Sequence, residues 1–130
     1  MTGSWDADIK LVYALDRSRS VAIDTIKNSD AFDVIANIRI GQSLMQIVSK
    51  CDLFVSVRNL SQSSALLSQK QSYALAPQSA PLNQQLIATF DAGWNADEGD
   101  VLEVIATFKV TAGVHQNYSL ARSTPFIVSD

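Results

Sequence analysis

Few residues in this chain carry the chemistry that usually marks a catalytic or metal centre. The 130 residues include one cysteine, Cys51, and one histidine, His115. A single cysteine cannot form a disulfide within the chain, and a zinc site needs several such ligands together. Neither a G-x-S-x-G nucleophile motif nor a glycine-rich phosphate loop occurs. We therefore expect no enzyme, no catalytic residues and no cofactor, with Cys51 in the core and His115 on the surface.

The sequence also lacks long apolar runs, a leader segment and an excess of positive charge. Its apolar runs span only a few residues, against the roughly 20 that a membrane-spanning helix needs. Residues 1–4 resemble an expression scar rather than a signal peptide, so the natural start of the chain stays open. The absence of a leader and the single cysteine slightly favour the cytoplasm. A pI near 4.9 argues against nucleic-acid binding, which needs a basic stripe.

Glycine and proline are scarce as well, which excludes collagenous and low-complexity chains. The sequence has five glycines and three prolines, and 47% of its residues are hydrophobic, a fraction typical of globular proteins. Domains usually contain roughly 100–200 residues. We therefore expect one domain, which we place at residues 5–130.

What the sequence does contain is repeated alternation of apolar and polar residues, the period of a strand with one buried face. The clearest case is 101–110, where every second residue from Leu102 to Val110 is apolar. Similar alternation predicts strands at 32–40, 53–58 and 86–91. In a further strand at 9–15, the shared face is expected to carry Ile9, Leu11, Tyr13 and Leu15.

The remaining segments are less regular. Residues 116–121 and 126–129 predict a last strand bent at Pro125, because proline cannot donate to a central ladder. Shorter strands are expected at 21–26 and 44–48. The windows 42–51 and 62–76 stay open between helix, strand and loop, because both contain helix formers without a helical stripe. We interpret the second as a long connection with a short edge strand at 72–76.

These segments predict an all-β fold. Antiparallel strands need only short turns, whereas parallel strands need long crossovers that this sequence does not supply. The expected architecture is two antiparallel sheets packed face to face, with about seven or eight strands and one short helix at most.

Residues 86–129 resemble the closing strands of an immunoglobulin-like or fibronectin type III sandwich. Gly99 and Asp100 form a turn before the alternating strand, a hairpin near 112–117 follows, and 123–128 opens the last strand. Leu102 stands where the corner tyrosine of that family is expected, and the family's disulfide is impossible here. The resemblance implies a sandwich with a binding or spacer role rather than catalysis.

Oxygen-bearing side chains gather between two predicted strands, and oxygen is the ligand that Ca²⁺ prefers. The EF-hand spacing fails, because Leu102 occupies the position of its terminal glutamate. Two interpretations stay open: a solvated turn, or a site for Ca²⁺ or a small polar ligand such as a sugar, with Trp94 as a stacking face. The candidate ligands are Asp91, Asn95, Asp97, Glu98 and Asp100.

Three aromatic residues, Trp94, Tyr118 and Tyr73, fall near predicted strand ends or loops. They would form an interaction surface if exposed together, because aromatic residues dominate interface energetics; alternatively, each covers an end of the core. We predict a non-catalytic interaction or structural module of a larger assembly or oligomer, contacting a protein partner or a second copy. The alternative is a ligand-binding domain at loop 91–100 and Trp94.

Overall fold

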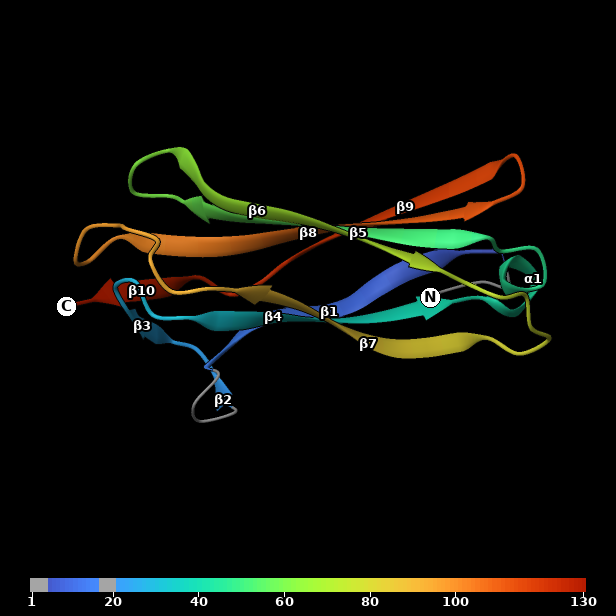
Figure 1. Ribbon diagram of the computed structural model, residues 1–130, viewed down its shortest axis with the longest axis horizontal. Helices are drawn as coiled ribbons and strands as arrows, with labels where there is room; N and C mark the ends of the chain where they lie inside the picture. Colours follow the sequence, from blue (N-terminus) through green and yellow to red (C-terminus); the bar gives the residue numbers. More distant parts are fainter. Residues whose placement is uncertain (1–4, 17–20) are drawn as a thin grey trace.

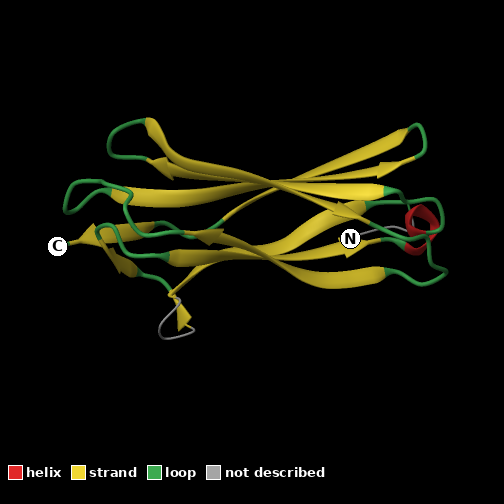
Figure 2. Cartoon of the chain, in the orientation of Figure 1, coloured by secondary structure: helices red, strands yellow, loops and turns green. Residues whose placement is uncertain are grey.

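The computed structural model describes residues 5–16 and 21–130, and their regular structure is almost entirely β-strand (Figures 1 and 2). One sheet has four strands in the order β2 (Val21–Ala22), β1 (Ala7–Asp16), β4 (Phe32–Ile40) and β7 (Leu82–Phe90). The other sheet has six strands: β3 (Thr25–Lys27), β10 (Phe126–Ser129), β8 (Val101–Ala112), β5 (Lys50–Asn59) and β6 (Ser64–Ala74), with β9 (His115–Arg122) also beside β8. The predicted two-sheet β-sandwich is confirmed.

Apolar rows from the two sheets meet to form the core. Every second residue of β8 is buried, as the alternation at 101–110 predicted, and the inward residues of β4 are buried opposite them. Aromatic rings fill one end of the core: the ring of Phe32 stacks on that of Phe90, with centroids 5.2 Å apart. Trp94 and Phe126 meet the ring of Phe32 edge to face at 6.1 and 6.3 Å, an arrangement that aromatic quadrupoles favour.

Strand β1 departs from the predicted facing because it contains a bulge. Ile9 pairs with Ile38 and Leu11 pairs with Asn37, which leaves Lys10 as the extra residue. An extra residue shifts the alternation of the following residues to the opposite face. After the bulge Val12 and Ala14 are therefore buried in the core. The expectation that one face carries Ile9, Leu11, Tyr13 and Leu15 is wrong: Ile9 faces the core, and the other three lie on the outer face of the sheet.

The two windows that the sequence left open form different structures. Residues 42–45 form the one-turn helix α1 (Gln42–Met45), whose Leu44 and Met45 are buried, so the strand expected at 44–48 is wrong. Residues 64–74 form β6, an edge strand of eleven residues rather than a short one at 72–76. The Ser- and Gln-rich sequence of β6 hides its period, because one side of an edge strand packs only partly against the core.

Strands β9 and β10 both pair along one edge of β8, and the chain bends between them at Ser123–Pro125. Strand β9 pairs with residues 105–112 of β8, and β10 pairs with Val101 and Leu102. At the bend the Ser123 amide donates to the Val104 carbonyl at 2.9 Å, and the Ser123 Oγ accepts from the Val104 amide at 3.0 Å. The predicted bend is confirmed. Strand β10 also pairs in parallel with β3, which the sequence did not predict.

The segment 21–26 forms the two short strands β2 and β3 rather than a single strand. No helix within the described ranges is long and apolar enough to cross a membrane. The residues assigned to an expression scar, 1–4, lie outside the described part of the chain.

Candidate interaction surface

The predicted acidic loop is organised around Asp100, whose carboxylate is bound by protein groups. Its Oδ2 accepts from the Asn59 side-chain amide at 2.7 Å and from the Asp97 backbone amide at 3.0 Å. The Gln62 side chain donates to Asp97 Oδ2 at 3.2 Å. These contacts join the loop to the turn between β5 and β6. The hydrogen bonds, foremost that from Asn59, lower the pKa of Asp100.

The other candidate calcium ligands do not converge. Asp91, Asn95 and Glu98 are exposed, and the Asn95 side-chain oxygen accepts from Asn28 at 3.1 Å. Among the described residues, no group of three His, Cys, Asp or Glu side chains is close enough to hold a metal ion. The loop is a hydrogen-bonded turn at one end of the sandwich, and the geometry offers Ca²⁺ no set of carboxylates.

Trp94 does not offer a stacking face, so its assignment to a ligand or partner surface is wrong. Only 6% of its surface is exposed, because the indole ring packs edge to face on Phe32. Its Nε1 donates to the carbonyl of Asp30 at 2.7 Å. The indole therefore covers one end of the core and fixes the turn before β4, which was the alternative interpretation of the three aromatic residues.

The other singled-out residues lie on or behind the six-stranded sheet. Tyr73 is half-buried on β6, where its hydroxyl bonds to Gln71, and burial raises its pKa. Tyr118 is 62% exposed on β9. His115 is exposed at the start of β9. Cys51 is buried in β5; burial, followed by the nearby charge of Asp52, raises the pKa of its thiol to about 11. Of the predicted residues, Tyr118 alone combines high exposure with a place on a sheet face.

That face is the outer surface of β6, β5, β8 and β9. It carries apolar side chains with lysine and arginine side chains around them. Cross-strand pairing places Lys70, Phe54, Thr107 and Leu120 in one row. The next row contains Ser72, Asp52, Lys109 and Tyr118. On the opposite side of the first row lies a row of Ser68, Ser56, Ile105 and Arg122. We call this surface, with Lys50 and Arg58 at its ends, the basic face.

Small side chains produce a hollow near the middle of the basic face. Its volume is about 330 Å³, and its lining includes Phe54, Ile105 and Lys70 together with the serines at 56 and 68. The two serines occupy neighbouring positions on β5 and β6, so no large side chain fills the space between the aromatic ring and the isoleucine. The hollow is large enough for one apolar side chain.

The aromatic rings of the basic face lie against lysine side chains. The Lys70 Nζ is 5.3 Å from the centre of the Phe54 ring, and the Lys109 Nζ is 5.7 Å from the centre of the Tyr118 ring. These distances are within the range of cation–π attraction. Each lysine thus keeps its charge at the surface beside an apolar ring, which gives the face adjacent apolar and cationic contact points.

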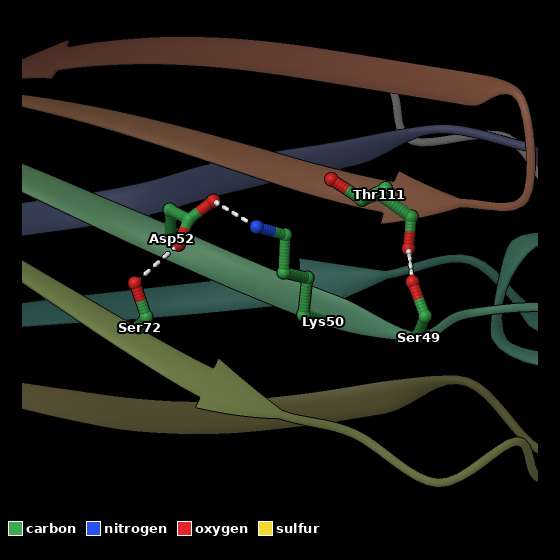
Figure 3. Close-up of polar contacts among 5 residues, drawn as sticks. All are labelled: Ser49, Lys50, Asp52, Ser72 and Thr111. Carbon is green, nitrogen blue, oxygen red and sulfur yellow. Dashed lines mark hydrogen bonds and ion pairs between the residues drawn. The ribbon is translucent and has the colours of Figure 1, made fainter.

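The two acidic residues of the basic face are held by neighbours on the same face. Asp52 is buried: its Oδ1 accepts from Ser72 Oγ at 2.5 Å, and its Oδ2 lies 3.9 Å from Lys50 Nζ (Figure 3). At the same end of the sheet, Ser49 Oγ donates to the Thr111 carbonyl at 3.1 Å. Glu103 Oε1 lies 3.5 Å from Arg122 Nη1. The face carries five cations: Lys50, Arg58, Lys70, Lys109 and Arg122. Because Lys50 and Arg122 pair with the two carboxylates, the face has an excess of three positive charges.

Sequence reasoning missed most of this surface. The alternation at 53–58 placed Phe54, Ser56 and Arg58 opposite the core, which was the available signal. The neighbours of these residues, Lys70 and Leu120, come from β6 and β9 through a register that a single sequence does not specify.

Comparisons with known proteins identify the fold alone. No protein-family model and no curated protein matches this chain. A solved structure described as a "putative beta-galactosidase from bacteroides fragilis" superposes with a TM-score of 0.55 at 13% sequence identity. The match covers 92% of this chain and 17% of that one. This chain is thus similar in fold to one part of a much longer protein.

Proposed function

We propose that this chain is a non-catalytic, immunoglobulin-like β-sandwich module that binds a protein partner through the basic face. The single observation that carries the proposal is the arrangement of that face: a hollow of about 330 Å³ beside exposed apolar side chains, surrounded by cations. Contiguous exposed apolar groups with a polar rim are typical of interaction sites. The similarity to 17% of a longer chain supports a role as one module among others.

The immunoglobulin-like assignment is supported by the order of the strands. Strands β1, β4 and β7 lie in one sheet, and β6, β5, β8 and β9 lie in the other, so successive strands are divided between two sheets as in Greek-key sandwiches. The segment 86–129, which carried the resemblance, forms the end of β7, all of β8 and β9, and β10.

The positions of the reactive side chains support a non-catalytic role. His115 is exposed at the end of a hairpin. The Cys51 thiol is buried with a raised pKa, so it stays protonated at neutral pH and is a poor nucleophile. The alternative, a ligand-binding site at loop 91–100, depended on an exposed Trp94 ring and on carboxylates available to a ligand. Trp94 is buried, and Asp100 is bound by protein groups.

Charge complementarity defines the partner. The basic face carries five cations and two carboxylates, and because the carboxylates pair with Lys50 and Arg122, it has an excess of three positive charges. Opposite charge across an interface steers association and selects among partners. The partner segment is therefore acidic, and it carries an aliphatic or aromatic side chain that enters the hollow beside Phe54.

Selection from a displayed library of random peptides tests this function. The wild-type chain should enrich peptides rich in Asp and Glu with at least one large apolar residue. Their affinity should fall at least tenfold for the double variant Phe54→Ser/Leu120→Ser, because both side chains point outward from the face and Leu120 is 60% exposed. The matched control is Ile127→Ser, an isoleucine that is 49% exposed on β10, outside the face.

Each outcome of the selection bears on a different part of the proposal. Enriched peptides that bind the double variant as well as the wild type would show that the basic face is not the site. Enrichment of basic or neutral peptides that still require Phe54 and Leu120 would keep the site and overturn the acidic partner. A selection that enriches no peptide above background would count against peptide-like recognition by this face.

A further inference from the structure

Strand β7 ends the four-stranded sheet and lacks the features that usually protect such an edge. It follows β4 in the order β2-β1-β4-β7 and pairs with β4 without a register shift. Its nine residues, Leu82–Phe90, contain neither a charge nor a proline. Natural edge strands are commonly protected by lysine, proline or bulges against pairing with another chain. In contrast, β6, the edge of the other sheet, carries Lys70 and a register shift opposite Val57 and Arg58.

One hydrogen bond shows which backbone groups of β7 point to its free side. The Thr89 carbonyl accepts from the Gln69 side chain at 2.9 Å, and Gln69 belongs to β6 rather than to β4. Successive residues of a strand direct their backbone groups alternately to its two sides. The amide and carbonyl groups of Ile87 and Gln85, which have the same parity as Thr89, therefore point away from β4.

An apolar row on the outer face of the same sheet runs to this edge. Tyr13, Ile35 and Ile87 are cross-strand neighbours on β1, β4 and β7. Ile35 points away from the core, yet only 2% of its surface is exposed, whereas Ile87 at the edge is 48% exposed. Leu11, which the bulge in β1 turns outward, lies beside the row and is 52% exposed.

We propose that β7 pairs antiparallel with β7 of a second copy of this chain, about a two-fold axis at Ile87. Pairing in this register joins the two four-stranded sheets into one, and places Gln85 opposite Thr89 of the second copy. The apolar row then continues through both Ile87 side chains to Ile35 and Tyr13 of the second copy, which covers the half-exposed isoleucine.

The second copy fits this edge because of its charge and symmetry. Between Arg58 and Asp91 the sequence contains one charged residue, Lys70, so two β7 strands meet without repulsion between like charges. A two-fold contact is self-complementary and closes as a dimer rather than a fibre. The Thr89 carbonyl has a second lone pair, so it can accept from the second copy while it keeps its bond to Gln69.

Sedimentation velocity over a wide concentration range tests the proposal. The wild-type chain should show a reversible monomer–dimer equilibrium. The variant Ile87→Lys should raise the dimer dissociation constant at least tenfold, because it places two lysines opposite each other at the axis. Its matched control is Ile127→Lys, which changes an isoleucine of equal exposure (49% against 48%) on β10, and this variant should dimerise like the wild type.

Amide hydrogen exchange locates the interface. Protection of the Gln85 and Ile87 amides should increase with protein concentration in the wild type and not in Ile87→Lys. A second variant, Gln85→Pro, removes one free-side amide without breaking a bond to β4, and it should also be monomeric while its circular dichroism stays unchanged. A wild-type chain that is monomeric at every concentration would overturn the proposal. So would a dimer that survives Ile87→Lys, or one whose Gln85 and Ile87 amides exchange freely.

Discussion

Single polar side chains hold the ends of this sandwich together, at positions where a purely apolar contact would leave backbone groups unpaired. The Trp94 indole donates to the Asp30 carbonyl, and the Asn28 side chain both donates to the Ala96 carbonyl and accepts from the Ala96 amide. Asp100 has the same role between the acidic loop and the β5–β6 turn. Buried polar groups usually find such partners because an unsatisfied group is costly.

Asp100 should make folding stability depend on pH in the acid range. Its pKa is lowered in the folded state, so its contribution to stability is present above its ordinary pKa and is lost as the pH falls through its folded pKa. We expect Asp100→Asn to have a lower melting temperature than the wild type at pH 7. The difference should shrink as the pH falls toward 2, as measured by thermal scans across that range.

The neighbouring carboxylate Glu98 provides the control for this prediction. Glu98 is an exposed acid of the same turn, so Glu98→Gln should follow the wild-type stability at every pH. A melting temperature of Asp100→Asn that stays lower by a constant amount down to pH 2 would show that the carboxylate charge is not the cause.

At the scale of elements, strand facing is decided by features that the residue pattern does not show. The inward rows of β4 and β8 could be predicted because their alternation is unbroken. In β1 the residues are as regular, but the bulge at Lys10 reverses the facing from Leu11 onward. Strand β6 could not be predicted because its side chains pack against the core only in part, so burial imposes little apolar period on Ser64–Ala74.

The same limit applies to the candidate surface. The outward direction of Phe54 could be predicted from its own strand, whereas its contact with Lys70 and its place in a row with Leu120 depend on pairings between distant segments. The free side of β7 and the burial of Ile35 likewise follow from sheet order. Composition near each residue carries no information on these pairings, because register is specified jointly by all strands of a sheet.

The bulge predicts an asymmetry between two single-residue deletions in β1. Deleting Lys10 removes the extra residue, so Ile9 and Leu11 become consecutive partners of Ile38 and Asn37 and every later side chain keeps its facing. We expect this variant to remain folded and to lose less than about 2 kcal/mol, the scale of one or two hydrogen bonds. We expect this deletion to disturb first the hydrogen bond from the Ile9 amide to Ser119 Oγ, which is 3.1 Å long.

Deleting Val12 instead should be severe. It leaves the bulge in place and reverses the facing of the neighbouring residues, which would expose apolar side chains or bury outward ones. We expect a loss of more than about 3 kcal/mol, comparable to removing a large core side chain. Urea unfolding of both variants measures the difference, and equal losses would show that the bulge does not set the facing of β1.

At the scale of the whole molecule, the cationic surface, the acidic loop and the reactive thiol lie in three different places. Cations are concentrated on the basic face, whereas the loop at one end carries the acidic cluster at 91–100. The chain's single thiol lies between the two sheets: Cys51 belongs to β5, which has β6 on one side and β8 on the other. A reagent can therefore reach this thiol only when the sandwich itself opens.

Cys51 should accordingly report on unfolding of the entire domain. Its thiol is 2% exposed and has a pKa raised to about 11 by burial and by the charge of Asp52. We expect labelling by a thiol-reactive dye at pH 8 to be slow, and to accelerate with urea along the slope of global unfolding, because local fraying does not expose a central strand. A cysteine placed at the exposed position 116, in a Cys51→Ala background, should react at once and independently of urea.

The raised pKa gives the same thiol a second signature at alkaline pH. Because the folded pKa lies above the ordinary value of 9.0, the unfolded chain loses its thiol proton first as the pH rises. The contribution of Cys51 to stability is therefore complete below about pH 9 and declines between about 9 and 11. Urea unfolding at a series of pH values should show a steeper decline for the wild type than for Cys51→Ala. If stability falls with pH in parallel for the two proteins, or if labelling is fast and its rate does not change with urea, the thiol lies at an accessible surface instead of between the two sheets.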